Sequence, residues 1–294
     1  MHTLKKHSRK YFYKTYSTMK KIIYNVLLNI YRFRHCVYNT WKEFWFRDMF
    51  RLCFWNLLWQ RDNIIYLRHL QLYTKPNFFV ITTLIEVFNR ELYNNMTGMY
   101  RVLDLWAYIW ESSLYLSRYN TEVIAFEPSA EKFWLLEKNI AHKNNIRAFN
   151  AAVVDDPCLS EIMFHERDPF DFCSSSAAQA KLDTTVTVSC KDIFSLLDEY
   201  DFDGLKMDIE WWEFPILEAL ISKNMFTFQK WIIEFHFTGS EVTERRKFFQ
   251  KFSTYLQENN YTLRVFDNDN VPLINQEDIQ NVSCLNLEFK KKLW

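Results

Sequence analysis

Short apolar runs alternate with longer amphipathic segments from residue 100 to the end of the chain. The runs predict strands over residues 101–105, 122–126, 146–151, 204–208, 230–235, 262–266 and 284–289. Between them, apolar residues at helical spacing predict helices near residues 110–118, 129–142, 192–200, 212–222 and 240–259. Because strands and helices alternate, we expect an α/β domain, a doubly wound, Rossmann-like fold with a seven-stranded, mostly parallel sheet.

An inserted segment and one helix start stand out within this pattern. Residues 161–166 and 184–189 favour strands that break the helix–strand rhythm, and they predict an inserted antiparallel pair. Ser129 follows Pro128 and precedes an apolar stripe, so it is predicted to cap the second helix of the domain.

The first 97 residues follow a different pattern. Residues 22–30 carry an apolar stripe at helical spacing, and residues 61–97 favour one or two more helices. We therefore divide the chain into a basic, aromatic, helical N-terminal extension, residues 1–97, and an α/β domain, residues 98–294.

Charge separates the two parts of the chain, although the formal net charge is zero. Residues 1–51 contain twelve lysines and arginines against two acidic residues, which gives +10, and the rest of the chain carries −10. A basic apolar helix is typical of membrane-surface or polyanion binding, so one interpretation of residues 1–60 is a peripheral contact of this kind. The other interpretation, which we favour, is a helix that packs on the α/β domain and leaves its basic face in solvent.

Neither a membrane span nor a secretory signal is predicted. No stretch approaches the roughly 18 apolar residues of a transmembrane segment, and the N-terminus lacks a compact apolar core before a cleavage site. We expect a cytoplasmic location, with or without peripheral membrane contact. The six cysteines are scattered with no C-x-x-C pair, so we expect reduced thiols and no metal site.

Asp104 and Glu127 end the first two predicted strands of the α/β domain. Parallel strands end at the same edge of a sheet, so both acids should face one crevice. Glu127 comes 23 residues after Asp104, a spacing typical of the acid that hydrogen-bonds ribose hydroxyls in nucleotide-binding folds. The alternative is that each acid caps a helix or a turn.

Two further strand ends carry ionisable side chains. Asp208 should point into the crevice, Glu210 lies in the following loop, and Glu213 lies in the first helical turn, where the helix dipole favours a carboxylate. Glu234 and His236 share one face of the next strand, and a histidine beside a carboxylate is a competent general base near neutral pH. An acidic helix start and a histidine bonded to a loop are the alternatives.

Four segments in this order resemble the FkbM-type methyltransferase family, over roughly residues 98–240. They read VLDLWAYIWESSLYL, VIAFEP, LKMDIEWWE and IIEFH. The resemblance implies the class I fold that uses S-adenosylmethionine. It places Asp104 and its turn at the methionine portion of that cofactor, Glu127 at the ribose, and Asp208 near the transferred methyl group. The implied cofactor-binding residues are Asp104, Trp106, Ala107, Trp110, Glu127, Pro128, Asp208 and Glu210, and the candidate catalytic residues are Asp208, Glu234 and His236.

Tryptophan stands where the family has glycine, at Trp106, Trp110 and Trp211, and Trp212 replaces a residue that is commonly small. The chain has 3 glycines and 11 tryptophans, whereas an average composition of about 7% glycine gives roughly twenty glycines. Either the tryptophans are genuine and fill the crevice, or UGA codons that encode glycine were read as tryptophan. We favour the second explanation, because turns that need positive φ and a close backbone approach require glycine.

The expected reaction is methyl transfer to a hydroxyl oxygen of a sugar, glycan, lipid or small metabolite. Asp208, Glu234 or His236 could remove the hydroxyl proton. Methylation of a nucleobase amino group goes with an Asn/Asp-Pro-Pro-aromatic segment, and this chain has Asp208-Ile209-Glu210 in that place. The alternatives are an RNA methyltransferase that binds through residues 1–60 and a non-catalytic binding module, should the tryptophans be genuine.

Overall fold

The computed structural model describes most of the chain beyond residue 90. The described residues are 52, 64–68, 70–75, 80, 83–84, 87–88, 91–166, 184–209, 212–225, 227–237, 241–267, 272–273 and 284–291. The chain forms two compact units, residues 1–89 and 90–294. The domain limits proposed from the sequence, 1–97 and 98–294, lie slightly later in the chain.

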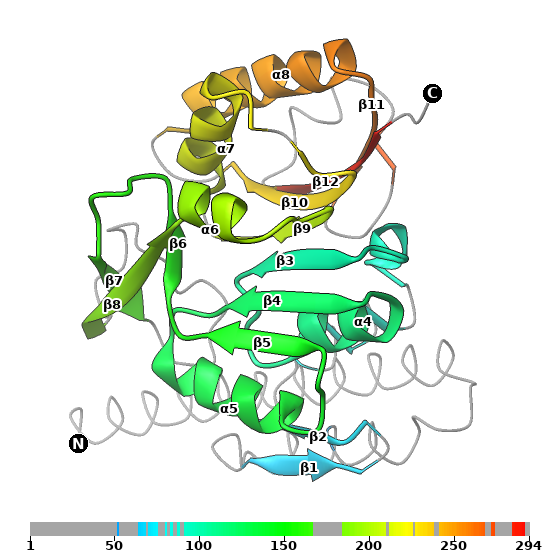
Figure 1. Ribbon diagram of the computed structural model, residues 1–294, viewed down its shortest axis with the longest axis vertical. Helices are drawn as coiled ribbons and strands as arrows, with labels where there is room; N and C mark the ends of the chain where they lie inside the picture. Colours follow the sequence, from blue (N-terminus) through cyan, green and yellow to red (C-terminus); the bar gives the residue numbers. More distant parts are fainter. Residues whose placement is uncertain are drawn as a thin grey trace, which may run out of the picture. The chain divides into compact units, whose positions relative to one another are not determined.

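A seven-stranded sheet forms the centre of the second unit (Figure 1), with the strand order β11-β12-β10-β9-β3-β4-β5. Its members are β3 (Arg101–Leu105), β4 (Glu122–Phe126), β5 (Ile146–Phe149), β9 (Gly204–Met207), β10 (Lys230–His236), β11 (Tyr261–Asp267) and β12 (Cys284–Lys291). The five strands from β5 to β10 run parallel, and β12 is antiparallel to both β10 and β11. The prediction of a doubly wound, mostly parallel α/β fold is confirmed.

Helices connect the strands of this sheet. They are α4 (Glu111–Tyr119), α5 (Ala130–Ile140), α6 (Ile193–Glu199), α7 (Glu213–Ser222) and α8 (Val242–Glu258), and a short 3-10 helix, η2 (Asn94–Met96), precedes β3. Four of them pack against the strand that follows in the chain: α4 on β4, α5 on β5, α7 on β10 and α8 on β11. Ser129 caps α5 as predicted, since its hydroxyl accepts from the Lys132 backbone N–H at 3.5 Å. None of the helices in the described ranges is long and apolar enough to cross a membrane.

Consecutive residues of the central strands are buried, which means that both faces of the sheet are covered. All four residues of β9 are buried, and so are the last four of β3. Continuous burial of this kind is typical of parallel strands with helices on both faces. Asp104 and Lys206 are charged residues inside these buried runs, and both belong to the site described below.

A second, three-stranded sheet stands beside the carboxyl ends of β3, β4 and β5 (Figure 1). It contains β6 (Ala152–Val154), β7 (Glu161–Glu166) and β8 (Thr184–Asp192), in the order β6-β8-β7. The predicted antiparallel pair is confirmed in β7 and β8. The strand predicted over residues 146–151 ends early, because the Asn150 amide donates to the backbone oxygens of Glu127 and Pro128 and the chain then turns into β6.

The described part of the first unit contains a hairpin, β1 (Ile65–Leu67) paired antiparallel with β2 (Leu72–Thr74). The helices predicted over residues 61–97 are therefore wrong for this stretch. Leu67 and Leu72 are buried on one face, while the rings of Tyr66 and Tyr73 pair on the other face with centroids 4.7 Å apart. This alternation has the period of a strand. The stripe predicted over residues 22–30 lies outside the described residues.

Candidate active site

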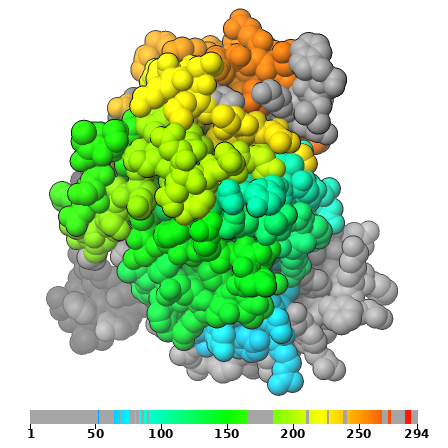
Figure 2. Space-filling view, in the orientation of Figure 1, coloured from blue at the N-terminus to red at the C-terminus, as the bar shows by residue number. Residues whose placement is uncertain are grey.

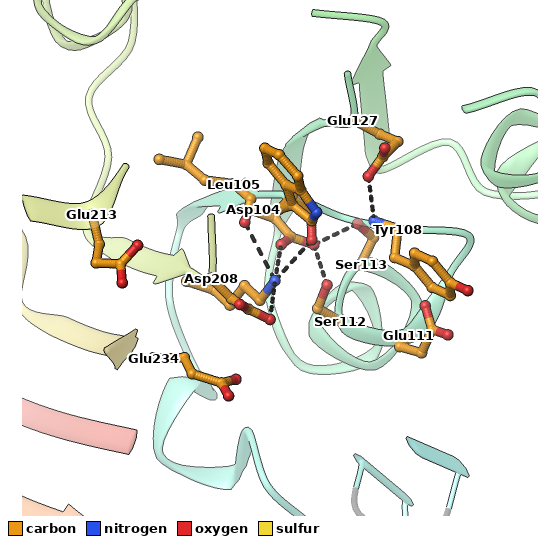
Figure 3. Close-up of polar contacts among 12 residues, drawn as sticks. Asp104, Leu105, Tyr108, Glu111, Ser112, Ser113, Glu127, Asp208, Glu213 and Glu234 are labelled. Atoms are coloured by element: carbon orange, nitrogen blue, oxygen red, sulfur yellow. Dashed lines mark hydrogen bonds and ion pairs between the residues drawn. The ribbon is translucent and has the colours of Figure 1, made fainter. Parts of the chain in front are cut away.

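Four parallel strands bring ionisable side chains to one edge of the large sheet. Asp104 lies in β3, Glu127 follows β4, Asp208 follows β9, and Glu234 lies near the end of β10. Figure 3 shows these carboxylates as sticks, together with Glu213 at the start of α7. The crevice at the carboxyl ends of such strands is where doubly wound folds bind their ligands.

Asp104 is fully buried in β3 and connects this strand to α4 through hydrogen bonds (Figure 3). The hydroxyls of Ser112 and Ser113, in the first turn of α4, both donate to its Oδ2 at 2.6 Å. Its Oδ1 lies 3.7 Å from the Lys206 ammonium. Asp104 therefore fixes the turn between β3 and α4, the segment assigned to the cofactor by the family resemblance.

Lys206 was not among the residues predicted from the sequence. Its Nζ donates to the backbone oxygens of Leu105 and Trp106, at 3.3 and 2.8 Å, and lies 3.9 Å from Asp208 Oδ2. One ammonium thus links the ends of β3 and β9. The sequence signal that could have identified Lys206 is its place inside the otherwise apolar run of β9, because a buried lysine requires polar partners.

Glu127 and the Pro128 that follows it are buried, and the carboxylate of Glu127 is closed off by backbone amides. Its two oxygens accept from the N–H groups of Tyr108 and Ser129, each at 2.9 Å. Burial raises the pKa of the Glu127 carboxyl to about 7. In this arrangement each of its oxygens accepts a hydrogen bond from the protein itself.

Lys132 in α5 is a second buried cation that the sequence analysis missed. Its ammonium lies 5.1 Å from the centre of the Tyr108 ring, and it has no hydrogen-bond partner among the described residues. The charge of Lys132 lowers the pKa of Glu127, but burial outweighs it. The Tyr108 ring and Glu127 therefore share one buried cation on this side of the loop.

The loop after β3 has two residues in the left-handed region, Trp106 at φ 73° and Tyr108 at φ 55°. The amides of Trp106 and Ala107 both donate to the Phe126 carbonyl at 2.9 Å, which holds the loop against the end of β4. Trp106 is partly buried with its ring centre 5.5 Å from that of Phe164 in β7, and Trp110 is fully buried. The indole of Trp106 therefore packs toward the small sheet that contains β7.

The order of the strand-end acids fits S-adenosylmethionine, since Asp104 lies in β3 and Glu127 follows the adjacent parallel strand β4, as the family resemblance implies. Two features fit it less well: backbone amides cover the carboxylate of Glu127, and Trp106 places an indole in the loop assigned to the cofactor.

Asp208, Glu234 and His236 come together at the ends of β9 and β10. His236 Nε2 lies 3.9 Å from Asp208 Oδ1 and 3.8 Å from Glu234 Oε1. On its other side, His236 Nδ1 lies 3.2 Å from Glu213 Oε1, which also accepts from the His236 backbone N–H at 2.9 Å. Because an ionised carboxylate only accepts hydrogen bonds, Glu213 favours the proton on Nδ1 and turns Nε2 toward the other two acids.

Glu111 is a further buried acid that the sequence analysis did not select. It begins α4, and burial raises the pKa of its carboxyl to about 8. Burial, followed by the charges of Asp104, Asp208 and Glu234, also raises the pKa of Tyr93 well above its usual value. Carboxylates therefore dominate the electrostatics of this site.

Two predicted residues, Glu210 and Trp211, lie outside the described residues, so their roles stay predictions. Trp212 precedes α7 with φ −78°, a backbone conformation that any residue adopts. Trp212 also lines a groove between α7 and α8, two helices that lie together at one end of this unit (Figure 2). The groove has mixed charge, and its ionisable residues are Asp155, Glu218, Glu241, Glu244, Arg245, Lys247 and Lys251.

The chain matches one protein family and is distantly similar to several solved methyltransferases. Residues 94–263 match the family described as Methyltransferase FkbM domain. A solved FkbM methyltransferase from Methylobacillus flagellatus KT is 14% identical with a TM-score of 0.40, over 90% of this chain and 60% of that one. An rRNA methylase from Streptococcus thermophilus is 9% identical with a TM-score of 0.41, over 69% of this chain and 95% of that one. Fibrillarin from Aeropyrum pernix, bound to S-adenosyl-L-methionine, is 9% identical with a TM-score of 0.37, over 66% and 68%. No curated protein matches the sequence.

Proposed function

The chain belongs to the FkbM methyltransferase family, and we propose that it methylates a hydroxyl oxygen of a sugar, glycan, lipid or small metabolite. The expected cofactor is S-adenosylmethionine, which supplies a methyl group already activated by its sulfonium. The protein then has to align the acceptor and remove the proton of its hydroxyl. We assign alignment of the cofactor to Asp104 and Glu127, together with Trp106, Ala107, Trp110, Pro128 and Glu210.

The observation that carries this proposal is the cluster of Asp208, Glu234 and His236. All three are proton acceptors, they lie at the ends of β9 and β10, and Lys206 links Asp208 to the Asp104 turn. Glu213 holds the His236 ring from the opposite side, which is the arrangement of an oriented general base. An acceptor hydroxyl placed against this cluster would meet a group able to take its proton.

An RNA acceptor is the second candidate, because residues 1–51 carry a charge of +10. Phosphate backbones bind such basic segments. A non-catalytic binding module is the third candidate, because the carboxylate of Glu127 is fully covered in the chain as written.

Release of S-adenosylhomocysteine, measured by mass spectrometry, tests these candidates. The chain with glycine at positions 106, 110 and 211 is incubated with S-adenosylmethionine and, in separate reactions, with sugars, glycans, lipid hydroxyls or RNA. We expect turnover with a hydroxyl acceptor, and turnover with RNA alone would replace the first proposal by the second. If calorimetry shows that neither the glycine variant nor the chain as written binds the cofactor, the binding-module candidate replaces both methyltransferase candidates.

The role of the cluster is tested by His236→Ala in the same assay. Loss of a group that takes part in proton removal lowers kcat by about 10²–10⁴-fold. His142→Ala is the matched control, since His142 is an exposed histidine after α5. Equal rates for the two variants would exclude His236 from the reaction.

A further inference from the structure

We propose that Asp208, Glu234 and His236 bind one divalent metal cation. The inference rests on the proposed function in one respect, because the cation would take the acceptor hydroxyl as a further ligand. Since the cation would then hold Nε2 of His236, the hydroxyl proton would leave to the solvent that reaches the site. A bound cation of this kind lowers the pKa of the hydroxyl and positions its oxygen. No metal site is predicted from the sequence, since the ligands come from two strands and show no motif spacing.

The spacing of the three groups suits a shared cation. Each side chain offers one ligand atom, and the three atoms lie within 4.8 Å of one another. Among the described residues, no other group of three His, Cys, Asp or Glu side chains meets this condition. His236 Nε2 lies 3.9 Å from Asp208 Oδ1 and 3.8 Å from Glu234 Oε1. Both distances exceed the length of a hydrogen bond, about 2.7–3.2 Å. With cation–ligand distances of about 2.0–2.3 Å, two ligands of one ion stand roughly 3–4.5 Å apart. The observed separations fall within that range.

A buried carboxylate orients the histidine ligand. Glu213 is fully buried, its Oε1 lies 3.2 Å from His236 Nδ1, and its Oε2 has no hydrogen-bond partner among the described residues. Histidines that bind metals commonly donate their other ring N–H to a carboxylate, which fixes the tautomer and the ring orientation. Glu213 is placed to do this, and it makes Nε2 the nitrogen that faces the two acids.

The local charge also favours a cation. Carboxylates of Asp104, Asp208, Glu213 and Glu234 lie close together here, and the Lys206 ammonium contacts two of them, Asp104 and Asp208. Lys206 approaches Oδ2 of Asp208, whereas Oδ1 faces His236, so the ammonium leaves one oxygen on the side of the proposed ion.

Solvent reaches the proposed site. The side chains of Asp208, Glu234 and His236 are 34%, 29% and 13% exposed. Structural metal sites are closed by protein ligands, whereas catalytic sites keep a position for water or substrate. Two carboxylates and one imidazole at a partly open position fit a divalent cation that binds a hydroxyl.

Titration of the full-length chain with Mn²⁺, without S-adenosylmethionine, tests the site. Free Mn²⁺ is followed by electron paramagnetic resonance. We expect one Mn²⁺ per chain, and at least roughly ten-fold weaker binding for Asp208→Asn, Glu234→Gln and His236→Ala. Asp198→Asn and His142→Ala are the matched controls, since both residues are exposed and lie away from the cluster. Circular dichroism shows whether each variant folds. If another variant fails to fold, the Mn²⁺ affinity of Glu234→Gln decides the result.

Two results overturn the proposal: no bound Mn²⁺, or binding that Glu234→Gln leaves unchanged. Methyl transfer that persists in a chelator, with no Mn²⁺ bound, would leave the proposed function intact and remove the metal site. Mn²⁺ binding without transfer to any acceptor would keep the metal site and remove the proposed function.

Discussion

Trp106 is a bulky residue in a backbone conformation that favours glycine. Its φ of 73° lies in the left-handed region, which costs an L-residue roughly 1–2 kcal/mol. Trp110 at φ 173° and Trp212 at φ −78° have conformations open to any residue. Of the described positions where tryptophan departs from the family pattern, position 106 is therefore the one whose backbone conformation favours glycine. At position 110 the structure accommodates the indole, which is fully buried.

Trp106→Gly is expected to strengthen binding of S-adenosylmethionine by at least about ten-fold, because glycine suits the positive φ and removes an indole from the loop assigned to the cofactor. Isothermal titration calorimetry on the two chains measures the effect. Trp134→Ala, which removes an exposed indole from α5, is the control and should leave binding unchanged. Equal binding by the chain as written would contradict the steric argument.

Buried carboxyls make the stability of the protein depend on pH. The pKa values of Glu111 and Glu127 rise from 4.5 to about 8 and about 7, because burial penalises the charged form. Between pH 4.5 and 8 the folded state keeps protons that the unfolded state releases, so the free energy of unfolding falls as pH rises. Stability contributed by these groups is present below about pH 4.5 and lost by about pH 8.

Glu111→Gln should reduce this pH dependence by an amount on the order of 2–4 kcal/mol between pH 5 and 8, since the amide does not ionise. Urea unfolding at the two pH values measures it. Glu244→Gln is the control, because Glu244 is exposed in α8. If the chain and the Glu111→Gln variant lose the same stability, Glu111 does not keep its proton in the folded state.

At the scale of elements, the contact between β3 and α4 depends on buried polar groups. Ser112 and Ser113 both donate to Asp104 Oδ2 at 2.6 Å, and all three residues are almost fully buried. Hydrogen bonds to a charged acceptor contribute about 1.5–3 kcal/mol each, and a buried carboxylate that loses them keeps its desolvation penalty. The two serines therefore stabilise the loop that carries Trp106.

Replacing both serines, Ser112→Ala with Ser113→Ala, should destabilise the fold by about 3–6 kcal/mol in urea unfolding. Ser117→Ala is the control from the same helix, since the hydroxyl of Ser117 donates locally to the Leu114 carbonyl. A loss as small as that of the control would show that Asp104 finds other donors.

The sequence predicts elements better than the places where they join. The strand and helix positions of the second unit follow from apolar periodicity, and they match within a few residues. The break between β5 and β6 was missed because it depends on the Asn150 side chain reaching the backbone of residues 127 and 128. The β1–β2 hairpin was missed because two three-residue strands are too short for a periodic pattern.

At the scale of the whole molecule, positive charge is concentrated in residues 1–51 and negative charge in the rest of the chain. The segment with +10 lies in residues 1–51, where a membrane or polyanion contact is one interpretation, and all but Leu52 of residues 1–63 lie outside the described residues. A basic segment near an anionic membrane contributes about 1 kcal/mol per lysine or arginine. Such a contact would therefore be electrostatic and sensitive to salt.

Neutralising four of these residues, Lys5, Lys6, Arg9 and Lys10, to glutamine in the full chain should weaken binding to anionic vesicles at least about ten-fold. Vesicle flotation in low salt measures it, with neutral vesicles as the lipid control. Lys247→Gln with Lys251→Gln is the protein control, since both lysines are exposed in α8. Unchanged binding would refute the membrane contact, and retention on RNA instead would favour the RNA acceptor.

The sequence by itself determined the fold class, the family and the strand ends that carry Asp104, Glu127, Asp208 and Glu234, because these depend on local periodicity and on motifs. Only the tertiary structure showed that backbone amides cover Glu127 and that Lys206 joins two strand ends. It also brought Glu213 against His236, on which the proposed metal site depends. The physical reason is sheet register: it decides which distant side chains meet, and no pattern along the chain encodes those distances.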